Sequence, residues 1–306
     1  MVWLVAALLV TDTRPAAHDA ADDWPAHPKR TSSRAKRPTT LVALLLTMAA
    51  SPTAADVTGA VSVSVVDRSG AMLTDLRAEE VTLKEDGQTR TIKRVERDGR
   101  PLALAVLVDS SEVMGKGFLR DLADPVMDFL DALPPAVDRT LMMIGTPPEV
   151  LPLEDPARTR AALRARAPFG KLSLYDGIAE ACLRLGQKRG TRRALVVLLS
   201  DRSSEEDRQK AFDAVGRAMP VMLAVQFQGA GTYAPGLDTI VQWTGGRYEQ
   251  IGSASGVGGT LKKLLPELEA PWLVVYETPG AVERRKVEVK VTRKGAKARV
   301  RGAALE

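Results

Sequence analysis

The chain has 306 residues, 45% of them apolar and 26% charged, which is enough to bury one substantial hydrophobic core and a smaller second one. Six of the 43 basic residues and four of the 38 acidic residues precede Asp56, which leaves 37 and 34 in the rest of the chain. The resulting net charge of +3 gives no reason to expect a nucleic-acid partner.

Residues 1–55 are predicted to be a leader that ends in a signal peptide cleaved after Ala55. Basic residues between positions 30 and 37 precede an apolar run at 41–50, and small residues follow at 53–55. The run is shorter than the roughly 20 residues that a membrane-spanning helix needs. We therefore expect an exported protein, periplasmic, in the cell envelope or extracellular, without stable membrane insertion after cleavage. A retained anchor is the alternative, and we expect the true start near Lys29.

Both histidines of the chain, His18 and His27, lie in this leader, so the mature protein is predicted to contain none. Serine and cysteine nucleophile systems, histidine general bases and ordinary zinc sites all need an imidazole. We therefore expect no enzyme and no catalytic residues, whereas a metal site with oxygen ligands stays open. The single cysteine, Cys182, is predicted to be a buried structural thiol in a helix.

The segment 56–100 is predicted to form antiparallel strands. Residues 61–65 alternate valine and serine, as expected for a half-exposed strand, and Asp86-Gly87 is a hairpin signal. A segment of this length is too short to form a stable sheet alone. We expect it to pair with the C-terminal segment.

From residue 102 onward, short apolar runs alternate with helical periods, which is typical of a mostly parallel sheet with helices on both faces. The predicted strands are 102–108, 140–144, 149–153, 194–200 and 221–227. The predicted helices are 118–133, 156–166, 174–188, 205–219, 237–243 and 260–268. These elements assign residues 101–270 to one Rossmann-like α/β domain.

The C-terminal segment 271–306 is predicted to pair with 56–100 in a small antiparallel β domain. Residues 287–291 alternate valine with charged residues, and the stretch 284–301 holds nine basic residues against one acid, Glu288. We interpret the basic residues as the solvated face of a strand rather than as a dedicated anion-binding site, because they fall largely on the polar side of the alternation.

Two carboxylates follow two of the predicted buried strands. Asp109 comes after 102–108, and Asp201 comes after 194–200. In an open parallel sheet, ligands bind at the carboxyl ends of the strands, where neighbouring connections diverge. Asp109 and Asp201 are therefore predicted to face one crevice.

These segments resemble the von Willebrand factor A domain in three places: Asp109-Ser110-Ser111 with Met114, then residues 173–177 (Ser-Leu-Tyr-Asp-Gly), then Leu199-Ser200-Asp201. The flanking segments are similar to those of bacterial secreted proteins called von Willebrand factor A related. The resemblance implies a metal-ion-dependent adhesion site, usually for Mg2+, in which an Asp-x-Ser-x-Ser loop, a threonine and a further aspartate supply oxygen ligands.

Residue by residue, Asp109, Ser111 and Asp201 match that site. The second serine position is Val113 and the threonine position is Leu172, so two hydroxyl ligands are missing. Ser173 or Ser110 would have to substitute. The expected site is degenerate and binds Mg2+ weakly or not at all, with no other cofactor.

We therefore expect a secreted protein-binding or adhesion-type module whose protein ligand and oligomeric state the sequence does not identify. The alternative is a structural envelope or scaffold protein that acts through its β domain without metal. A hydrolase or phosphotransferase is the least favoured class, because no phosphate-loop pattern follows the first strand and Ser111 stands where a second acid would be needed.

Overall fold

A computed structural model of the chain describes residues 57–114, 117–200, 208–227, 236–269, 271–279 and 286–305. The predicted leader, residues 1–55, lies outside the described residues, and so does Asp201. No helix in the described ranges is long and apolar enough to cross a membrane.

The central element is a six-stranded sheet with the strand order β10-β9-β8-β5-β6-β7. Its strands are β5 (Leu102–Val108), β6 (Asp138–Met143), β7 (Glu149–Leu151), β8 (Arg192–Leu199), β9 (Val221–Phe227) and β10 (Arg247–Ile251). All neighbouring strands are parallel except β7, which is antiparallel to β6. Numbered in chain order from the β7 edge, the order is 3-2-1-4-5-6, a common doubly wound arrangement.

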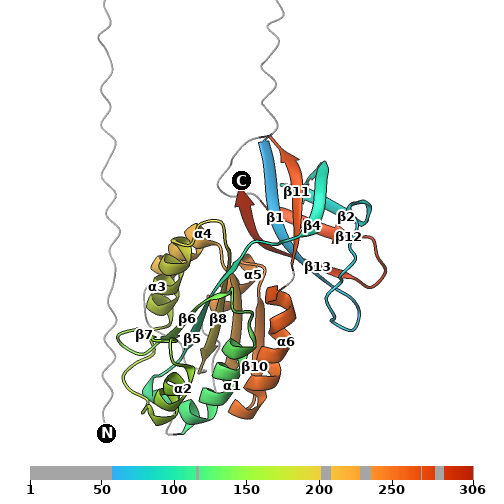
Figure 1. Ribbon diagram of the computed structural model, residues 1–306. Helices are drawn as coiled ribbons and strands as arrows, with labels where there is room; N and C mark the ends of the chain where they lie inside the picture. Colours follow the sequence, from blue (N-terminus) through green and yellow to red (C-terminus); the bar gives the residue numbers. More distant parts are fainter. Residues whose placement is uncertain are drawn as a thin grey trace, which may run out of the picture. The chain divides into compact units, whose positions relative to one another are not determined.

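Helices cover both faces of this sheet (Figure 1). One face packs against α1 (Phe118–Ala132), α2 (Pro156–Ala165) and α6 (Val257–Glu269). The other face packs against α3 (Leu174–Gly186), α4 (Arg208–Ala218) and α5 (Leu237–Trp243). Strand β5 is buried along its whole length and supplies alternate residues to the two cores, which is why its sequence is continuously apolar.

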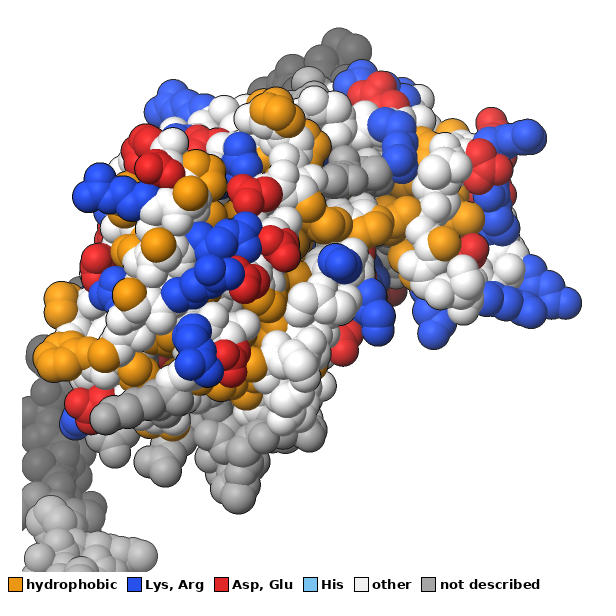
Figure 2. Space-filling model, turned by 60° about the horizontal axis from the view of Figure 1, so that its bottom comes forward, with side chains coloured by type: hydrophobic (Ala, Val, Ile, Leu, Met, Phe, Trp, Pro, Cys, Tyr) orange, Lys and Arg blue, Asp and Glu red, His pale blue; other side chains and the backbone are white. Residues whose placement is uncertain are grey.

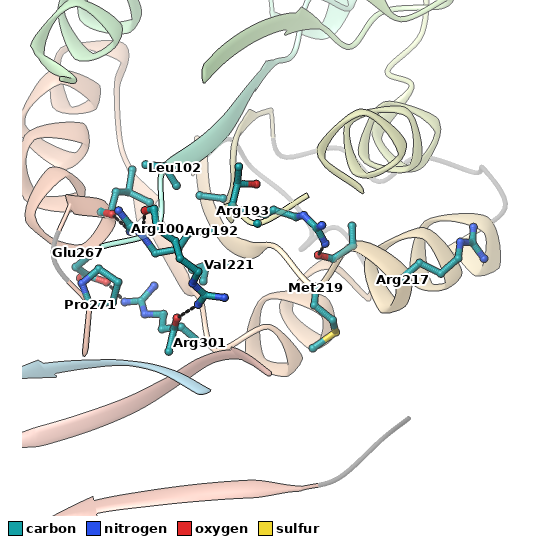
Figure 3. A pocket seen from close by; sticks show the side chains of 16 residues that line it. Arg100, Leu102, Arg192, Arg193, Arg217, Met219, Val221, Glu267, Pro271 and Arg301 are labelled. Atoms are coloured by element: carbon teal, nitrogen blue, oxygen red, sulfur yellow. Dashed lines mark hydrogen bonds and ion pairs between the residues drawn. The ribbon is translucent and has the colours of Figure 1, made fainter. Parts of the chain in front are cut away.

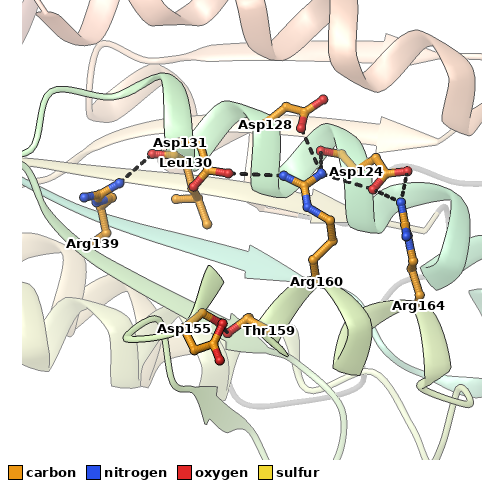
Figure 4. Close-up of polar contacts among 9 residues, drawn as sticks. All are labelled: Asp124, Asp128, Leu130, Asp131, Arg139, Asp155, Thr159, Arg160 and Arg164. Atoms are coloured by element: carbon orange, nitrogen blue, oxygen red, sulfur yellow. Dashed lines mark hydrogen bonds and ion pairs between the residues drawn. The ribbon is translucent and has the colours of Figure 1, made fainter. Parts of the chain in front are cut away.

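Helix α2 is joined to α1 by ion pairs on its outer surface (Figure 4). The Arg160 guanidinium contacts the carboxylates of Asp124, Asp128 and Asp131, which recur every three or four residues on α1 and so lie on one face. Arg164 also contacts Asp124, at 2.6 Å. The helix starts as the sequence predicts, because Asp155 caps it by accepting the Arg158 N–H and Pro156 occupies the first turn.

The two flanking segments form antiparallel sheets around a separate core. A four-stranded sheet has the order β13-β1-β11-β4 and a three-stranded sheet the order β12-β2-β3. The strands are β1 (Val57–Val66), β2 (Val81–Glu85), β3 (Gln88–Arg90), β4 (Ile92–Arg97), β11 (Trp272–Thr278), β12 (Val287–Val291) and β13 (Lys297–Leu305). β2 and β3 form the predicted hairpin, with positive φ at Asp86 and Gly87.

The structure confirms the predicted fold class, an α/β sheet with helices on both faces together with an antiparallel β domain. It corrects the half-exposed interpretation of residues 61–65. β1 lies between β11 and β13, and within residues 61–65 both the valines and the serines are buried. The serines face arginine and aspartate side chains instead of water: Ser62 donates to Asp98, and Ser64 accepts from Arg301.

The interpretation of the basic C-terminal stretch as a solvated face is wrong for one residue. Arg301 is only 3% exposed and forms an ion pair with Glu267 of α6. A partner 34 positions away gives no local signal in the sequence. Cys182 is buried as predicted, and burial raises the pKa of its thiol to about 12.

Candidate functional site

The candidate site lies at the carboxyl ends of β5 and β8, which are neighbours in the sheet. After β5 the chain continues to α1 on one face, and α4, which follows β8 in the chain, lies on the opposite face. This divergence marks the position at which doubly wound sheets form a crevice.

Asp109 is the first residue after β5, and its carboxylate is fully buried. One carboxylate oxygen accepts the Ser111 backbone N–H and the other accepts the Ser200 backbone N–H, both at 2.9 Å. Asp109 therefore joins the loop after β5 to the end of β8. Each oxygen retains a second lone pair, so these hydrogen bonds do not by themselves prevent a further contact.

The two serines whose backbone N–H groups donate to Asp109 also carry buried hydroxyl groups. Ser111 and Ser200 are both buried, and within the described part of the chain neither hydroxyl oxygen has a hydrogen-bond partner. An unpartnered buried hydroxyl is unfavourable. A water molecule or a ligand bound here would supply the hydrogen bonds that these two hydroxyls lack.

The segments 144–148 and 167–173 lie at the same end of the sheet. Phe169 donates its backbone N–H to the Ser110 carbonyl at 2.9 Å, and Glu112 donates to the Gly170 carbonyl at 3.0 Å. The Ser173 hydroxyl forms a hydrogen bond of 3.0 Å with the hydroxyl of Thr146. Thr146 in turn donates to the Lys171 carbonyl.

The two positions that depart from the family pattern cannot supply oxygen, and the structure shows what their side chains do instead. Val113 is 40% exposed on the loop after β5. Leu172 is 9% exposed and packs in the core beneath α3. Asp201, the predicted third-loop ligand, lies outside the described residues.

The described residues do not fit a complete hard-cation site. Of the predicted ligand set they bring together Asp109, Ser110, Ser111 and Ser173, which include a single carboxylate. Among the described residues there is no group of three or more acidic, histidine or cysteine side chains suited to a metal ion. Because Mg2+ takes about six oxygen ligands, the described residues supply only part of such a set.

A second property of the site is its apolar rim, which the sequence analysis missed. Phe169 is 71% exposed, and Val113 on the loop after β5 is also an exposed apolar side chain, whereas the exposed Val150 lies on the edge strand β7. Phe169, Pro147 and Pro148 line a pocket of about 360 Å³ whose floor includes Ser110. Figure 2 brings the lower end of the view in Figure 1 forward and shows hydrophobic side chains exposed among charges of both signs.

Two runs of glycine and proline in the sequence could have predicted these exposed apolar residues. Residues 145–148 (Gly-Thr-Pro-Pro) and 168–170 (Pro-Phe-Gly) are runs of loop-forming residues, and each contains an element of the pocket. A phenylalanine between Pro168 and Gly170 is not part of a helix or strand core. It is therefore a candidate for an exposed contact residue.

No family model matches the chain, and no curated protein is similar to it in sequence. Solved structures with similar folds include a von Willebrand factor type A protein from Catenulispora acidiphila, with 10% identity, a TM-score of 0.49 and coverage of 82% of this chain and 73% of that one. Proximal thread matrix protein 1 from the mussel byssus, solved with a zinc-occupied adhesion motif, has 13% identity, a TM-score of 0.47 and coverage of 57% and 47%. The SpRpn10 VWA domain has 20% identity, a TM-score of 0.43 and coverage of 53% and 94%. The strand order of the six-stranded sheet, with helices on both faces, is the observation that defines the architecture.

Proposed function

We propose that this chain is an exported protein-binding module that holds a protein ligand at the crevice formed by the carboxyl ends of β5 and β8. The observation that carries the proposal is the exposed Phe169, which lines a pocket together with Pro147, Pro148 and Ser110, the residue that follows Asp109. Exposed aromatic and aliphatic side chains on loops that a rigid sheet positions are typical of protein-binding surfaces.

The polar surroundings of the rim suit a protein partner as well. Glu149 forms an ion pair with Arg166 beside Phe169, and Glu112 is exposed next to Val113. An apolar centre with a charged rim excludes water from the contact while the charges select the partner. The two unpartnered hydroxyls at Ser111 and Ser200 add groups that a polar ligand atom or an ordered water would satisfy.

We further propose that binding does not require Mg2+. Val113 and Leu172 replace two hydroxyl ligands of the site that the resemblance implies. The adhesion-type site is therefore reduced in this chain, and the apolar rim supplies most of the affinity. Binding rather than catalysis is proposed because both histidines precede the predicted cleavage point.

Affinity capture with the full chain tests the site. Wild-type protein, Phe169→Ser and Leu183→Ser are each immobilised and exposed to the cell-envelope fraction. Leu183 is the matched control, because it is also an exposed apolar residue, at 50%, but lies on α3. We expect wild type and Leu183→Ser to retain the same protein and Phe169→Ser to lose it. If wild type and both variants all retain the same protein, the proposed site is contradicted and contact through the β domain is favoured.

The metal arm of the experiment repeats the capture with excess EDTA and then with added Mg2+. We expect the retained protein to be the same in both conditions. Loss in EDTA with recovery in Mg2+ would show that Asp109 and its neighbours do hold a cation. Export is tested separately by sequencing the N-terminus of the protein recovered outside the cytoplasm, where the expected first residue is Asp56.

A further inference from the structure

A second pocket lies at the opposite end of the six-stranded sheet, at the amino ends of β5, β8 and β9. It encloses about 410 Å³ and is lined by Leu102, Arg192 and Val221 from the beginnings of those strands and by Ser62 of β1 (Figure 3). The crevice described above lies at the carboxyl ends of the same strands. The two sites are therefore separated by the length of the sheet.

Arginine dominates this pocket. Five arginines line it against a single carboxylate, that of Glu267: Arg100, Arg192, Arg193, Arg217 and Arg301. Four of them lie near the sheet, whereas the Arg217 side chain points away from the others (Figure 3). Such a density of guanidinium groups is unfavourable unless negative charge compensates it.

The acids near the pocket compensate only part of this charge. Asp98 pairs with Arg100 through both of its oxygens, at 2.9 and 2.7 Å. Glu267 is shared, because one oxygen accepts from Arg247 at 2.7 Å and the other accepts from Arg301. Each of the two carboxylates is thus already committed to arginine.

Arg192 and Arg193 donate to carbonyl oxygens, which carry no net charge. Arg192 donates to the carbonyls of Arg100 and Leu268. Arg193 donates to the carbonyls of Ala218, at 3.0 Å, and Lys188, at 3.2 Å. The hydrogen bonds of these side chains are largely satisfied, but among the described residues no carboxylate forms an ion pair with either guanidinium.

Two N–H groups in the pocket have no acceptor within the described residues: Arg301 Nη1 and Arg193 Nε. Arg301 is 3% exposed, so a donor of this charged group that lacks an acceptor is unfavourable. Burial lowers the pKa of Arg192 and of Arg193, and the nearby charge of Arg100 adds to this effect, although the Asp98 carboxylate opposes it at Arg192. An oxyanion forms strong, charge-assisted hydrogen bonds with a buried N–H group of an arginine.

We propose that this pocket binds a small organic anion, whose phosphate or carboxylate group accepts hydrogen bonds from the buried arginines and whose apolar part packs on the pocket wall. The wall includes Leu102, Val221, Leu268 and Pro271. The volume exceeds that of an inorganic oxyanion, which is why an organic group is expected. The unpartnered N–H groups of Arg301 and Arg193 are the contacts that this site provides and the rest of the fold does not use.

Isothermal titration calorimetry of the full chain tests the site with inorganic phosphate, phenyl phosphate and phenylacetate. Phenyl phosphate is expected to bind more tightly than inorganic phosphate because it also covers the apolar wall. Comparison of phenyl phosphate with phenylacetate distinguishes a phosphate from a carboxylate ligand. Binding should weaken as ionic strength rises, because ion pairing contributes to it.

Arg193→Met is the informative variant, and Arg184→Met is its matched control. Arg184 is an exposed arginine on α3 that pairs with Glu180, outside the pocket. Loss of a hydrogen bond between charged groups should weaken binding of the preferred anion about 10-fold or more in Arg193→Met. Arg184→Met should bind as wild type does.

Arg301→Lys provides a second variant that retains the charge opposite Glu267. We expect it to weaken anion binding, because lysine lacks the planar fork of donors. Circular dichroism of each variant checks that the fold is retained. Absence of heat for all three anions at millimolar concentration, or equal affinity of wild type and Arg193→Met, would overturn the proposal.

Discussion

The carboxylate of Asp109 accepts the backbone N–H of Ser200, 91 residues further along the chain, at 2.9 Å. Its other oxygen accepts the N–H of Ser111. The resemblance to the adhesion-type domain implies a metal ligand at Asp109, and the structure adds a second role for it. The same side chain fixes the ends of two neighbouring strands, so substitutions at Asp109 change stability as well as any binding.

Asp109→Ala is expected to lower the free energy of unfolding by about 2–4 kcal/mol, because two buried N–H groups lose their acceptor. Urea unfolding followed by circular dichroism measures the change. Asp176→Ala is the control, since its exposed carboxylate pairs only with Lys210 in the described contacts. If the two variants lose the same small amount of stability, Asp109 does not have the structural role assigned to it.

The ion pairs between α1 and α2 give a prediction about salt. Arg160 contacts three carboxylates that are about half exposed, so solvent ions screen the attraction. The difference in urea midpoint between wild type and Arg160→Met should shrink as salt rises from about 0.1 M to about 1 M, over which the Debye length falls from about 10 Å to about 3 Å.

The control for that measurement is Arg139→Met. The Arg139 guanidinium donates to the Leu130 carbonyl on α1 at 2.8 Å rather than to an acid (Figure 4). Its effect on the urea midpoint should depend less on salt. Equal salt dependence of the two variants would show that Arg160 acts through packing of its alkyl chain and not through charge.

The sheet could be predicted from the sequence because its strands are buried on both faces. Residues 102–108 and 221–227 are uninterrupted apolar runs, and the structure places β5 and β9 on those residues. β10 (Arg247–Ile251) was missed because it is an edge strand with a partly exposed, polar sequence. The pattern that identifies a buried strand is absent at an edge.

The arginine pocket could not be predicted, because the contacts of Arg192 and Arg301 that build it join distant parts of the chain. Arg301 meets Ser64 across 237 positions and Glu267 across 34. The valine and serine alternation at 61–65 predicts one dry and one wet face, yet the serine face is covered by charged groups of the adjoining elements. The alternation of polar and apolar residues shows which side chains are polar. It does not show whether a polar side chain contacts water or a buried polar group.

Asp98 gives a prediction about pH. Burial by itself raises the pKa of its carboxyl, but hydrogen bonds from Arg100 and Ser62 outweigh that effect and hold the pKa below its ordinary value of 3.8. The pKa is lower in the folded state than in the unfolded state. The ion pair therefore stabilises the fold fully above about pH 3.8, and the contribution is lost as the pH falls through the folded-state value.

Asp98→Asn should accordingly be less stable than wild type by about 2 kcal/mol near pH 7, and the difference should narrow as the pH falls below 3.8. Urea unfolding at pH 7, 5, 4 and 3 measures it. Asp213→Asn, an exposed residue of α4, is the control. A difference that grows at low pH would reverse the assignment and show that protonated Asp98 is the stabilising form.

Gly245 allows the turn after α5 to approach the backbone of β13. Its φ is +67°, and a Cβ at this position would lie 1.6 Å from the Val300 carbonyl oxygen, so a side chain requires the backbone to move. Gly190 is a matched control, because its φ is +68° and no atom lies within 4 Å of the corresponding Cβ position. In Gly190→Ala we expect only the conformational strain of a left-handed residue, about 1–2 kcal/mol.

Gly245→Ala should lose more stability than Gly190→Ala, because the carbonyl contact adds to the same backbone strain. Since Val300 precedes Arg301, the forced movement of β13 should also weaken the ion pair between Arg301 and Glu267. Urea unfolding of both variants gives the difference, and hydrogen exchange at β13 shows where it arises. Equal losses in the two variants would mean that β13 yields to the added methyl group without resistance, and that the contact at Gly245 does not fix the position of the strand that carries Arg301.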